Sequence, residues 1–513
     1  MGTIFSDRGN INMIDRRTAS RNLRIQAAES EYARHVPEQL ANGEEFTYPY
    51  VASYSKGLPH DTFGDVEPRA YRLLLRALAT KRFEDFEQIP LGRPDSRRLT
   101  HPQAGLAFDL EGTDAQALTI PPAPRIDGPR NSAEMAELYW MALSRDVRFT
   151  DFRTDRVVAA AAADLSAMSD FRGPKRNGKV TPGTLFRGST PGDLAGPFIS
   201  QFLFADVPYW TTPMRQHIST VQAGVDYLTE FDEWLAVQNG APRDPGRPSG
   251  PLRYLQTPRD LATYVHLDAP PYQAYLNANL ILFGMRAPLD PGNPYLYSKN
   301  QEALVAYGPA QIFTLVAEVV ARALKAIWYQ KWSVHRRLRP EEFGGRVHLH
   351  KTGRRSYPMI DAEILNSGAL RATHEKWGTY LLRQAYPEGS PTHPAYGAGH
   401  AVIAGACVTV LKAWFDESYI LPNPKVPNDA GSELVDYDGP DRGRLTVGGE
   451  LNKLAANIST GRNIAGIHWR TDYDEAVTLG ETVAIRLLRE QQLAAHEIGA
   501  LSLTRFDGTT VVI

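Results

Sequence analysis

Apolar residues recur along this chain mostly at helical spacing, and the alternation typical of strands is rare. The clearest pattern begins at Pro309, a residue that suits the first turn of a helix. One apolar stripe then runs through Ile312, Val316, Val319, Ala323 and Ile327. Four residues further, the same stripe presents Lys331. A lone lysine near a helix end most often extends to solvent, so this position alone does not indicate a functional role for Lys331.

Further helices are predicted over 67–87, 132–170, 218–239, 399–417 and 451–492. The helix at 399–417 is apolar on nearly all sides, as is typical of a central helix. The first 60 residues are predicted to be rich in loops, and 88–131 and 421–450 to be extended or surface chain. Asp507-Gly508 predicts a hairpin at the C-terminus.

The pattern therefore predicts a mainly α-helical protein with long connecting loops and a few short strands. We divide the chain into two parts that form one compact unit. Residues 1–285 are expected to be a helical half with wrapping segments that contact other copies, and 286–513 a catalytic helical bundle. The length of 513 residues is enough for one large core or several small ones.

The composition, with a net charge of -2, does not favour nucleic-acid binding. The sequence contains no apolar run of 18 residues, so we expect no membrane-spanning helix. The single cysteine, Cys407, excludes an intrachain disulfide and a multi-thiolate metal site. The N-terminus has no apolar signal-peptide segment, although Gly2 and Ser6 match the short and unspecific myristoylation pattern. We expect a soluble protein without membrane partners, cytoplasmic by default, whose location the sequence does not otherwise determine.

Candidate chemistry lies in three segments, which read KWSVHRRLRP at 331–340, SPTHPAYGAGHA at 390–401 and GRNIAGIHWRTD at 461–472. Lys331, Arg339 and Arg462 offer three cations for a multiply charged oxyanion; arginine donates in a planar fork and lysine as a compact charge. His400 and His468 are each able to act as nucleophile, metal ligand or general acid.

Glycines stand at the start of the helix that follows the second segment. They flank Ala398 and lead into His400, and Gly399 lets a backbone N–H approach an anion at the helix N-terminus.

The third segment raises a geometric question. His468 and Asp472 are four residues apart, so on a helix they share a face and the carboxylate is placed to fix the imidazole tautomer. Arg462 and His468 are six apart and diverge on an ideal helix. Their convergence requires Arg462 to reach round, or a helix break near Gly461 or Gly466.

In order and spacing, these residues resemble the vanadium-dependent haloperoxidases and the type 2 phosphatidic acid phosphatases. Several details are similar to the bromoperoxidase branch of the haloperoxidases: the eight-residue step from Lys331 to Arg339 in HRRLRPEE, His393 ahead of His400, and the motif GRNIAGIHWRTD. The resemblance is strongest over about 290–475 and extends more weakly over most of the chain.

This resemblance implies two four-helix bundles, with a vanadate site at one end of the C-terminal bundle. His468 would be the protein ligand of vanadium. The equatorial oxygens would be held by the cationic side chains of Lys331, Arg339 and Arg462 and by the backbone N–H of Gly399. His400 would be the acid–base group, His393 a modulating histidine and Asp472 the support of His468.

The resemblance also implies the reaction. Vanadium(V) would act as a Lewis acid without redox change, and hydrogen peroxide would oxidise a halide to a hypohalite-level species that halogenates a small organic acceptor. Lys331 would take part by polarising the peroxide. Related bromoperoxidases form dimer-based assemblies, so we expect a homo-oligomer. A structural calcium is conceivable by analogy, but no convincing acidic loop supports it.

Two positions depart from the family pattern. Ala398 replaces the usual serine and so removes a hydroxyl donor to the oxyanion. A hydrogen bond to a charged group contributes about 1.5–3 kcal/mol, so its loss should weaken vanadate binding. Gln330 stands where bromoperoxidases often have arginine, and its place beside Lys331 suggests an influence on halide preference. Bromide is favoured over chloride and iodide by the remaining features of the branch.

Two other functions stay open at this stage. An acid phosphatase would use the same pocket for phosphate, with the histidine at the position of His468 as nucleophile, and vanadate would inhibit it. Its membrane-type relatives, however, carry spanning helices. A weakly active oxyanion-binding protein is the third reading, because Ala398 removes one donor.

Overall fold

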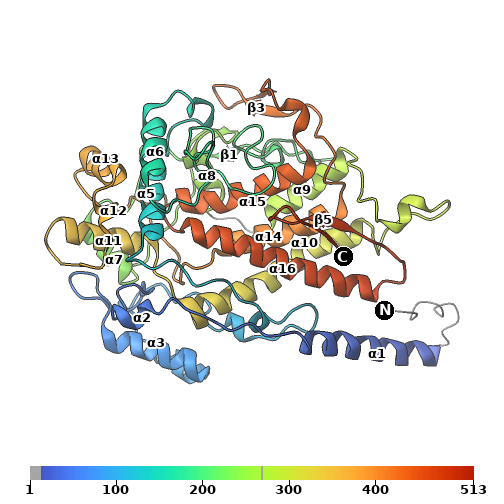
Figure 1. Ribbon diagram of the computed structural model, residues 1–513, viewed down its shortest axis with the longest axis horizontal. Coiled ribbons are helices and arrows are strands. Elements are labelled where there is room, and N and C mark those ends of the chain that lie inside the picture. Colours follow the sequence, from blue (N-terminus) through green and yellow to red (C-terminus); the bar gives the residue numbers. More distant parts are fainter. Residues whose placement is uncertain (1–12, 267–269) are drawn as a thin grey trace.

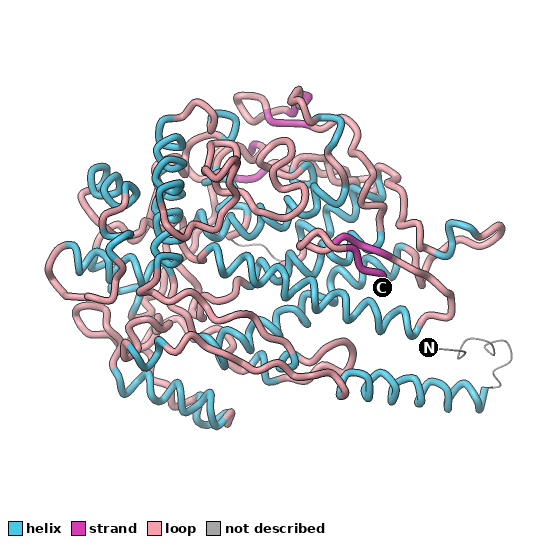
Figure 2. Tube along the Cα trace, viewed as in Figure 1, coloured by secondary structure: helices cyan, strands magenta, loops and turns pink. Residues whose placement is uncertain are grey.

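The structure, a computed structural model, describes residues 13–266 and 270–513. Helices joined by long loops dominate it, and its strands are short and occur in separate two-stranded antiparallel sheets (Figures 1 and 2). The prediction of a mainly α-helical fold is therefore confirmed.

The C-terminal bundle contains the longest buried helices, α10 (Pro309–Tyr329), α14 (Gly399–Trp414), α15 (Val447–Ile464) and α16 (Arg470–Ala494). Helix α14 packs against the other three and is buried along almost its full length (Figure 1). Glycines let α14 and α16 approach closely: a Cβ added to Gly405 would lie 2.0 Å from Val477 O, and one added to Gly480 2.1 Å from Val402 O. Small residues thus fix the centre of this bundle.

A second group of packed helices stands beside this bundle and consists of α5 (Pro129–Leu143), α6 (Arg156–Ala167), α12 (Ala362–Leu365) and α13 (Gly368–Trp377). It draws helices from both parts of the sequence. The main hydrophobic cluster likewise extends from Ala52 to Phe506 without a break between the halves. The division at residue 285 stays a prediction.

The N-terminal elements are α1 (Met13–Tyr32), α2 (Glu44–Thr47), α3 (Pro68–Thr80) and α4 (Phe83–Phe86). Helix α1 contradicts the prediction of loops over the first 60 residues. It lies along one edge of the molecule, largely exposed (Figure 1), and lacks the apolar stripe that signals a helix in a sequence. The pattern with Gly2 and Ser6 lies outside the described residues.

The remaining α-helices are α7 (Phe231–Gln238), α8 (Pro258–Tyr264), α9 (Gln273–Gly284) and α11 (Pro340–Lys351). The helix predicted over 218–239 is wrong in its first half, where a short strand and turns precede α7 and Gly224 has a φ of +79°. The pattern at 67–87 forms two helices, because Lys81 adopts a left-handed conformation with φ of +58° between α3 and α4.

Short strands pair as β1 (Ile218–Ser219) with β2 (Leu252–Arg253), β3 (Lys425–Pro427) with β4 (Leu434–Asp436), and β5 (Ser502–Thr504) with β6 (Thr510–Val512). The last pair is the predicted C-terminal hairpin, with Gly508 at φ of +84°. Single helical turns complete the fold: the 3-10 helices η1 (Ala104–Leu106), η2 (Ala115–Ala117), η3 (Phe149–Asp151), η4 (Gln201–Leu203), η5 (Pro294–Tyr297) and η7 (Arg442–Arg444).

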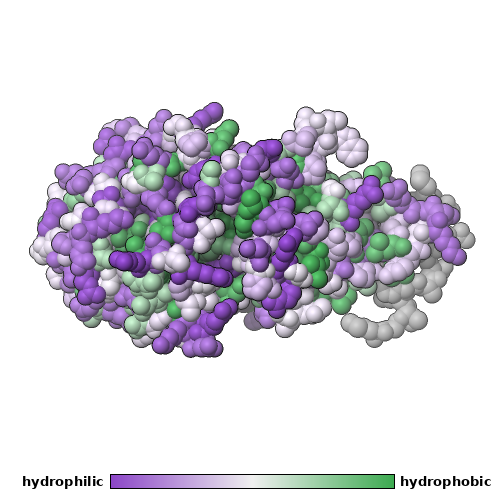
Figure 3. Space-filling model, turned by 90° about the horizontal axis from the view of Figure 1, so that it is seen from above, coloured by the Kyte–Doolittle hydropathy of each residue, from purple (hydrophilic) through white to green (hydrophobic). Residues whose placement is uncertain are grey.

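Across the described ranges, no helix combines the length and apolar character needed to cross a membrane. The face shown in Figure 3 carries mainly hydrophilic residues, with hydrophobic ones scattered among them.

Candidate active site

The three segments singled out in the sequence meet at one end of the C-terminal bundle. Lys331 lies on η6 (Gln330–His335), a π-helical turn that continues α10, and Arg339 is the N-cap residue of α11. The loop that carries His393 leads into α14. Arg462 lies in the last turn of α15, and His468 lies between α15 and α16.

Arg339 joins the first segment to the other two. Its Nη1 donates to Ile467 O at 2.8 Å and to His468 Nε2 at 3.0 Å. Its Nε and Nη2 donate to His393 O and His393 Nδ1, both at 3.0 Å. The side chain is fully buried, and burial lowers the pKa of Arg339 to about 10. This guanidinium is therefore a fixed charge at the centre of the site.

Lys331 is buried with its ammonium turned towards the second segment. Its Nζ donates to Pro394 O and Ala395 O, both at 2.8 Å, and lies 5.7 Å from the centre of the Trp328 ring. Burial, together with the positive charge of Arg339, holds the pKa of Lys331 well below its usual range. The stripe of α10 thus does not carry this lysine to solvent but into the site.

The hydrogen bonds of His468 define its tautomer. Its Nδ1 lies 2.8 Å from Asp472 Oδ2, and its Nε2 faces Arg339 Nη1. A guanidinium only donates, so Nε2 is the accepting nitrogen and the proton is on Nδ1. Burial and the nearby charge of Arg339 hold the pKa of His468 well below 6.5, so the ring is neutral with a lone pair on Nε2.

A break in the helix after Arg462 resolves the geometric question. Gly466, between α15 and α16, has a φ of +89°, and a Cβ there would lie 2.7 Å from Gln384 Nε2. Arg462 donates to Val265 O at 2.8 Å, and its charge contributes to lowering the pKa of His468. The two residues are thus brought into one electrostatic environment by the break at Gly466.

The second segment supplies the N-terminus of α14. Ala398 is the N-cap residue, with its N–H donating to Asp472 O at 2.8 Å. Gly399 is the first residue of the helix, and a Cβ there would lie 3.2 Å from the Trp328 ring. His400 follows and is partly exposed, whereas His393 is buried with its ring 4.8 Å from that of Trp328.

The side chain of Gln330 makes its described hydrogen bonds outside the group of site residues. Its Nε2 donates to Gln39 Oε1 at 3.0 Å and Leu118 O at 2.9 Å, and its Oε1 lies 3.2 Å from His335 Nε2. The described contacts of this amide therefore do not include the cations and histidines of the site.

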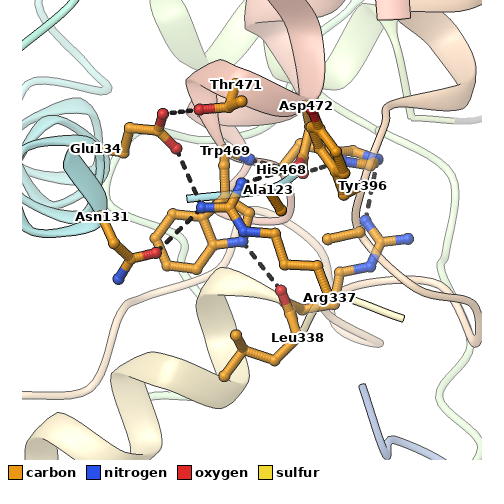
Figure 4. Close-up of polar contacts among 12 residues, drawn as sticks. Ala123, Asn131, Glu134, Arg337, Leu338, Tyr396, His468, Trp469, Thr471 and Asp472 are labelled. Atoms are coloured by element: carbon orange, nitrogen blue, oxygen red, sulfur yellow. Dashed lines mark hydrogen bonds and ion pairs between the residues drawn. The ribbon is translucent and has the colours of Figure 1, made fainter. Parts of the chain in front are cut away.

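Residues that the sequence did not reveal support the site from outside. Arg337 lies between Asp472 and helix α5, where Asn131 and Glu134 face it (Figure 4). Trp328 forms one wall beside Lys331 and His393. Arg337 stands in the motif HRRLRP, but its α5 partners are some 200 residues away in sequence, and no local pattern signals them.

The donor set fits a tetrahedral oxyanion that accepts one nitrogen ligand. Arg339 donates to the accepting nitrogen of His468, and the charges of Lys331 and Arg462 act on the same ring. Arg462 Nε is buried with no hydrogen-bond partner among the described residues. Such a set favours vanadate, in which oxygens need donors and the metal needs a lone pair. No cluster of three or more His, Cys, Asp or Glu that might hold a metal ion occurs in the described part of the chain, and calcium stays an untested prediction.

Comparisons with known proteins agree over the length of the chain. The VCPO second helical-bundle domain matches residues 311–496. The vanadium-dependent bromoperoxidase of Corallina officinalis is 37% identical over 98% of this chain and 99% of its own. The corresponding enzyme of Ascophyllum nodosum is 36% identical over 92% of this chain and 88% of its own.

A solved structure extends the similarity to the whole fold. The second vanadate-dependent bromoperoxidase from Ascophyllum nodosum, described as homohexameric, superimposes with a TM-score of 0.94 at 30% identity. The match covers 100% of this chain and 93% of that one. On this similarity in sequence and fold, the chain belongs to the vanadium-dependent bromoperoxidase family.

Proposed function

We propose that this protein is a vanadate-dependent haloperoxidase that oxidises bromide with hydrogen peroxide and thereby halogenates small organic acceptors. The observation that carries the proposal is the neutral His468, whose accepting Nε2 stands among buried cations. A nucleophilic histidine of a phosphatase would need the same lone pair, so the preference for vanadate chemistry rests in addition on the similarity to the bromoperoxidases.

Each residue has a distinct task in the proposed site. Arg339 and Arg462 hold the negative oxygens, and Lys331 adds a hydrogen-bond donor to oxygen bound beside it. Bound vanadate supplies a Lewis acid that makes peroxide oxygen electrophilic. His400, at the N-terminus of α14, would accept or return the proton of a reacting oxygen. The cations Lys331, Arg339 and Arg462 are buried, which keeps bulk water away from them.

His393 and Gly399 complete the proposal. His393 would modulate the site, and the hydrogen bond that its Nδ1 accepts from Arg339 Nη2 supports this role. The backbone N–H of Gly399, in the first turn of α14, is a further donor for an oxyanion.

The experiment measures bromination of a diketone by the purified protein with peroxide and bromide, before and after vanadate is added. Activity should appear with vanadate between pH 5 and 8 and disappear in His468→Ala. Phosphate release from an aryl phosphate that vanadate inhibits would instead support the phosphatase. Vanadate binding with neither activity would support the oxyanion-binding protein and overturn the proposal.

Halide preference is tested in the same assay. Bromide should give the highest kcat/KM among chloride, bromide and iodide, each tested at equal concentration. A higher value for chloride would contradict the choice of bromide. Gln330→Arg tests the second departure, and its effect should be small because the Gln330 amide bonds to Gln39 and Leu118.

We further propose that the protein is a homo-oligomer, with a dimer as its building block. The homohexameric relative supports the homo-oligomer, and so does α1, a 20-residue helix that is largely exposed along its length. An isolated helix of this length is marginal in water, so α1 needs a packing partner. Light scattering of the full chain should give a multiple of 57.0 kDa, and a monomer at micromolar concentration would overturn the proposal.

A further inference from the structure

Arg337 is a buried cation whose donors bridge two parts of the protein. Its Nη1 donates to Asp472 Oδ1 at 3.2 Å, and its Nη2 to Asn131 Oδ1 at 3.1 Å and to Glu134 Oε2 at 3.3 Å. The guanidinium carbon lies 4.6 Å from the centre of the Trp469 ring, and Figure 4 shows this stacking. Position and orientation of the guanidinium are thus both constrained.

The carboxylate of Asp472 is divided between two partners. Oδ1 accepts from Arg337, while Oδ2 accepts from His468 Nδ1 at 2.8 Å and from the Trp469 N–H at 3.0 Å. Because both oxygens are engaged, the carboxylate cannot rotate without breaking a buried hydrogen bond. The orientation of the His468 ring is therefore tied to the position of Arg337.

Helix α5 anchors this arrangement from the N-terminal half. Glu134 also accepts from the Thr471 hydroxyl, so that it holds α16 beside Asp472 as well as Arg337. Asn131 and Glu134 are fully buried and lie outside residues 311–496, the segment matched by the helical-bundle domain. The support of His468 thus comes partly from outside that domain.

We propose that Arg337, held by Asn131 and Glu134, is a positioning residue that aims the accepting nitrogen of His468 at the bound oxyanion. The proposal rests on the proposed vanadate site. Without Arg337, Asp472 Oδ1 is left buried and unpaired, and the carboxylate turns towards other donors. His468 then loses the contact that fixes its ring, and vanadate binds more weakly.

Direct binding measurements test this role. Vanadate affinity of the metal-free protein is determined by calorimetry for wild type and Arg337→Met. Outer partners of a metal-binding histidine typically change metal affinity about 10- to 100-fold, so the dissociation constant should rise at least tenfold. A rise below threefold overturns the proposal.

The orientation of His468 has its own readout, which does not need vanadate. Nitrogen NMR of the metal-free protein should show His468 with its proton on Nδ1, the signal being assigned by its loss in His468→Gln among the 13 histidines. Arg337→Met should leave the proton on Nδ1, because Arg339 still donates to Nε2, but should shift the Nδ1 resonance, because the acceptor Asp472 changes its orientation. An unchanged resonance would contradict the positioning role. If wild type binds no vanadate, the proposed function fails while this measurement still decides the positioning role.

A matched pair of variants on α5 separates positioning from general stability. Glu134→Gln disturbs the contact to Arg337, whereas Glu137→Gln disturbs an equally buried ion pair to Arg470, one helical turn away and without contact to Asp472. Both should lower the unfolding temperature, but only Glu134→Gln should raise the vanadate dissociation constant by threefold or more. Equal changes in affinity would overturn the proposal, even if Arg337→Met does not fold.

Discussion

Ala398→Ser should tighten the binding of vanadate, because it restores a hydroxyl at the N-terminus of α14. Ala398 is the N-cap residue, with φ of -73° and ψ of 131°, a backbone conformation in which serine caps a helix. A serine oxygen there accepts from a backbone N–H of the first turn, which leaves its hydrogen to point towards the site. One substitution thus adds both a helix cap and an oxyanion donor.

The two effects have different magnitudes and different assays. The cap should stabilise the metal-free protein by about 1 kcal/mol, measured by denaturant unfolding. The hydrogen bond to charged vanadate should contribute about 1.5–3 kcal/mol, which is roughly a 10- to 150-fold lower dissociation constant. Calorimetric titration of vanadate into the metal-free protein measures the second effect.

Ala404→Ser is the matched control, since Ala404 is equally buried in α14 but farther from its N-terminus. Its hydroxyl should bond to the backbone of its own helix and leave vanadate affinity unchanged. The reasoning is refuted if Ala398→Ser stabilises the protein while its vanadate dissociation constant equals that of wild type. That result would mean that the hydroxyl caps the helix without reaching the oxyanion.

Three further predictions concern the backbone, the buried lysine and pH. Gly466→Ala should destabilise the protein by about 1–2 kcal/mol and weaken vanadate binding. The control Gly508→Ala, at a similar φ in the C-terminal hairpin, should destabilise the protein but leave vanadate binding unchanged. Equal vanadate affinities of the two variants would contradict this prediction. Lys331→Met removes the donor proposed for a bound oxygen, so calorimetric titration should show a vanadate dissociation constant at least tenfold higher, and an unchanged constant would contradict this role. Burial lowers the pKa of His60 from 6.5 to about 3. Between these values the unfolded chain takes up a proton that the folded protein does not, so wild type loses stability as pH falls. As pH falls, the free energy of unfolding of His60→Gln should decrease less than that of wild type, by up to about 1.4 kcal/mol per pH unit. Urea unfolding at pH 7, 6 and 5 measures this difference, and an equal pH dependence of the two proteins would exclude the linkage.

Local patterns in the sequence predicted α10, α14 and the C-terminal hairpin correctly, because periodicity and turn residues act over a few positions. The resemblance of their motifs to the haloperoxidases, and not periodicity, grouped Lys331, Arg339 and His468 in one site, and the structure brings Arg339 and His468 into contact. Local reasoning failed for α1, which is mostly polar and whose few apolar residues, such as Leu23 and Ile25, form no clear stripe.

Long-range contacts account for the rest of what the sequence did not disclose. The sequence left open whether Arg462 reaches round or the helix breaks near Gly461 or Gly466, and only the backbone of the folded chain shows the break at Gly466. The role of Arg337 depends on Glu134, a residue of an otherwise ordinary helical stretch. Such pairings arise from packing between distant segments, which spacing within a motif does not encode.

The π-helical turn η6 makes the direction of the site residues depend on chain length in this segment. A π turn holds one residue more than the corresponding α-helical turn. Deleting one residue after Lys331 would let α10 continue regularly and rotate the following positions by about 100°. Arg337 and Arg339 would leave their partners while Lys331 stayed in place. Insertions and deletions here should therefore be more damaging than most substitutions, so that evolution is expected to vary residue identity in η6 more readily than its length.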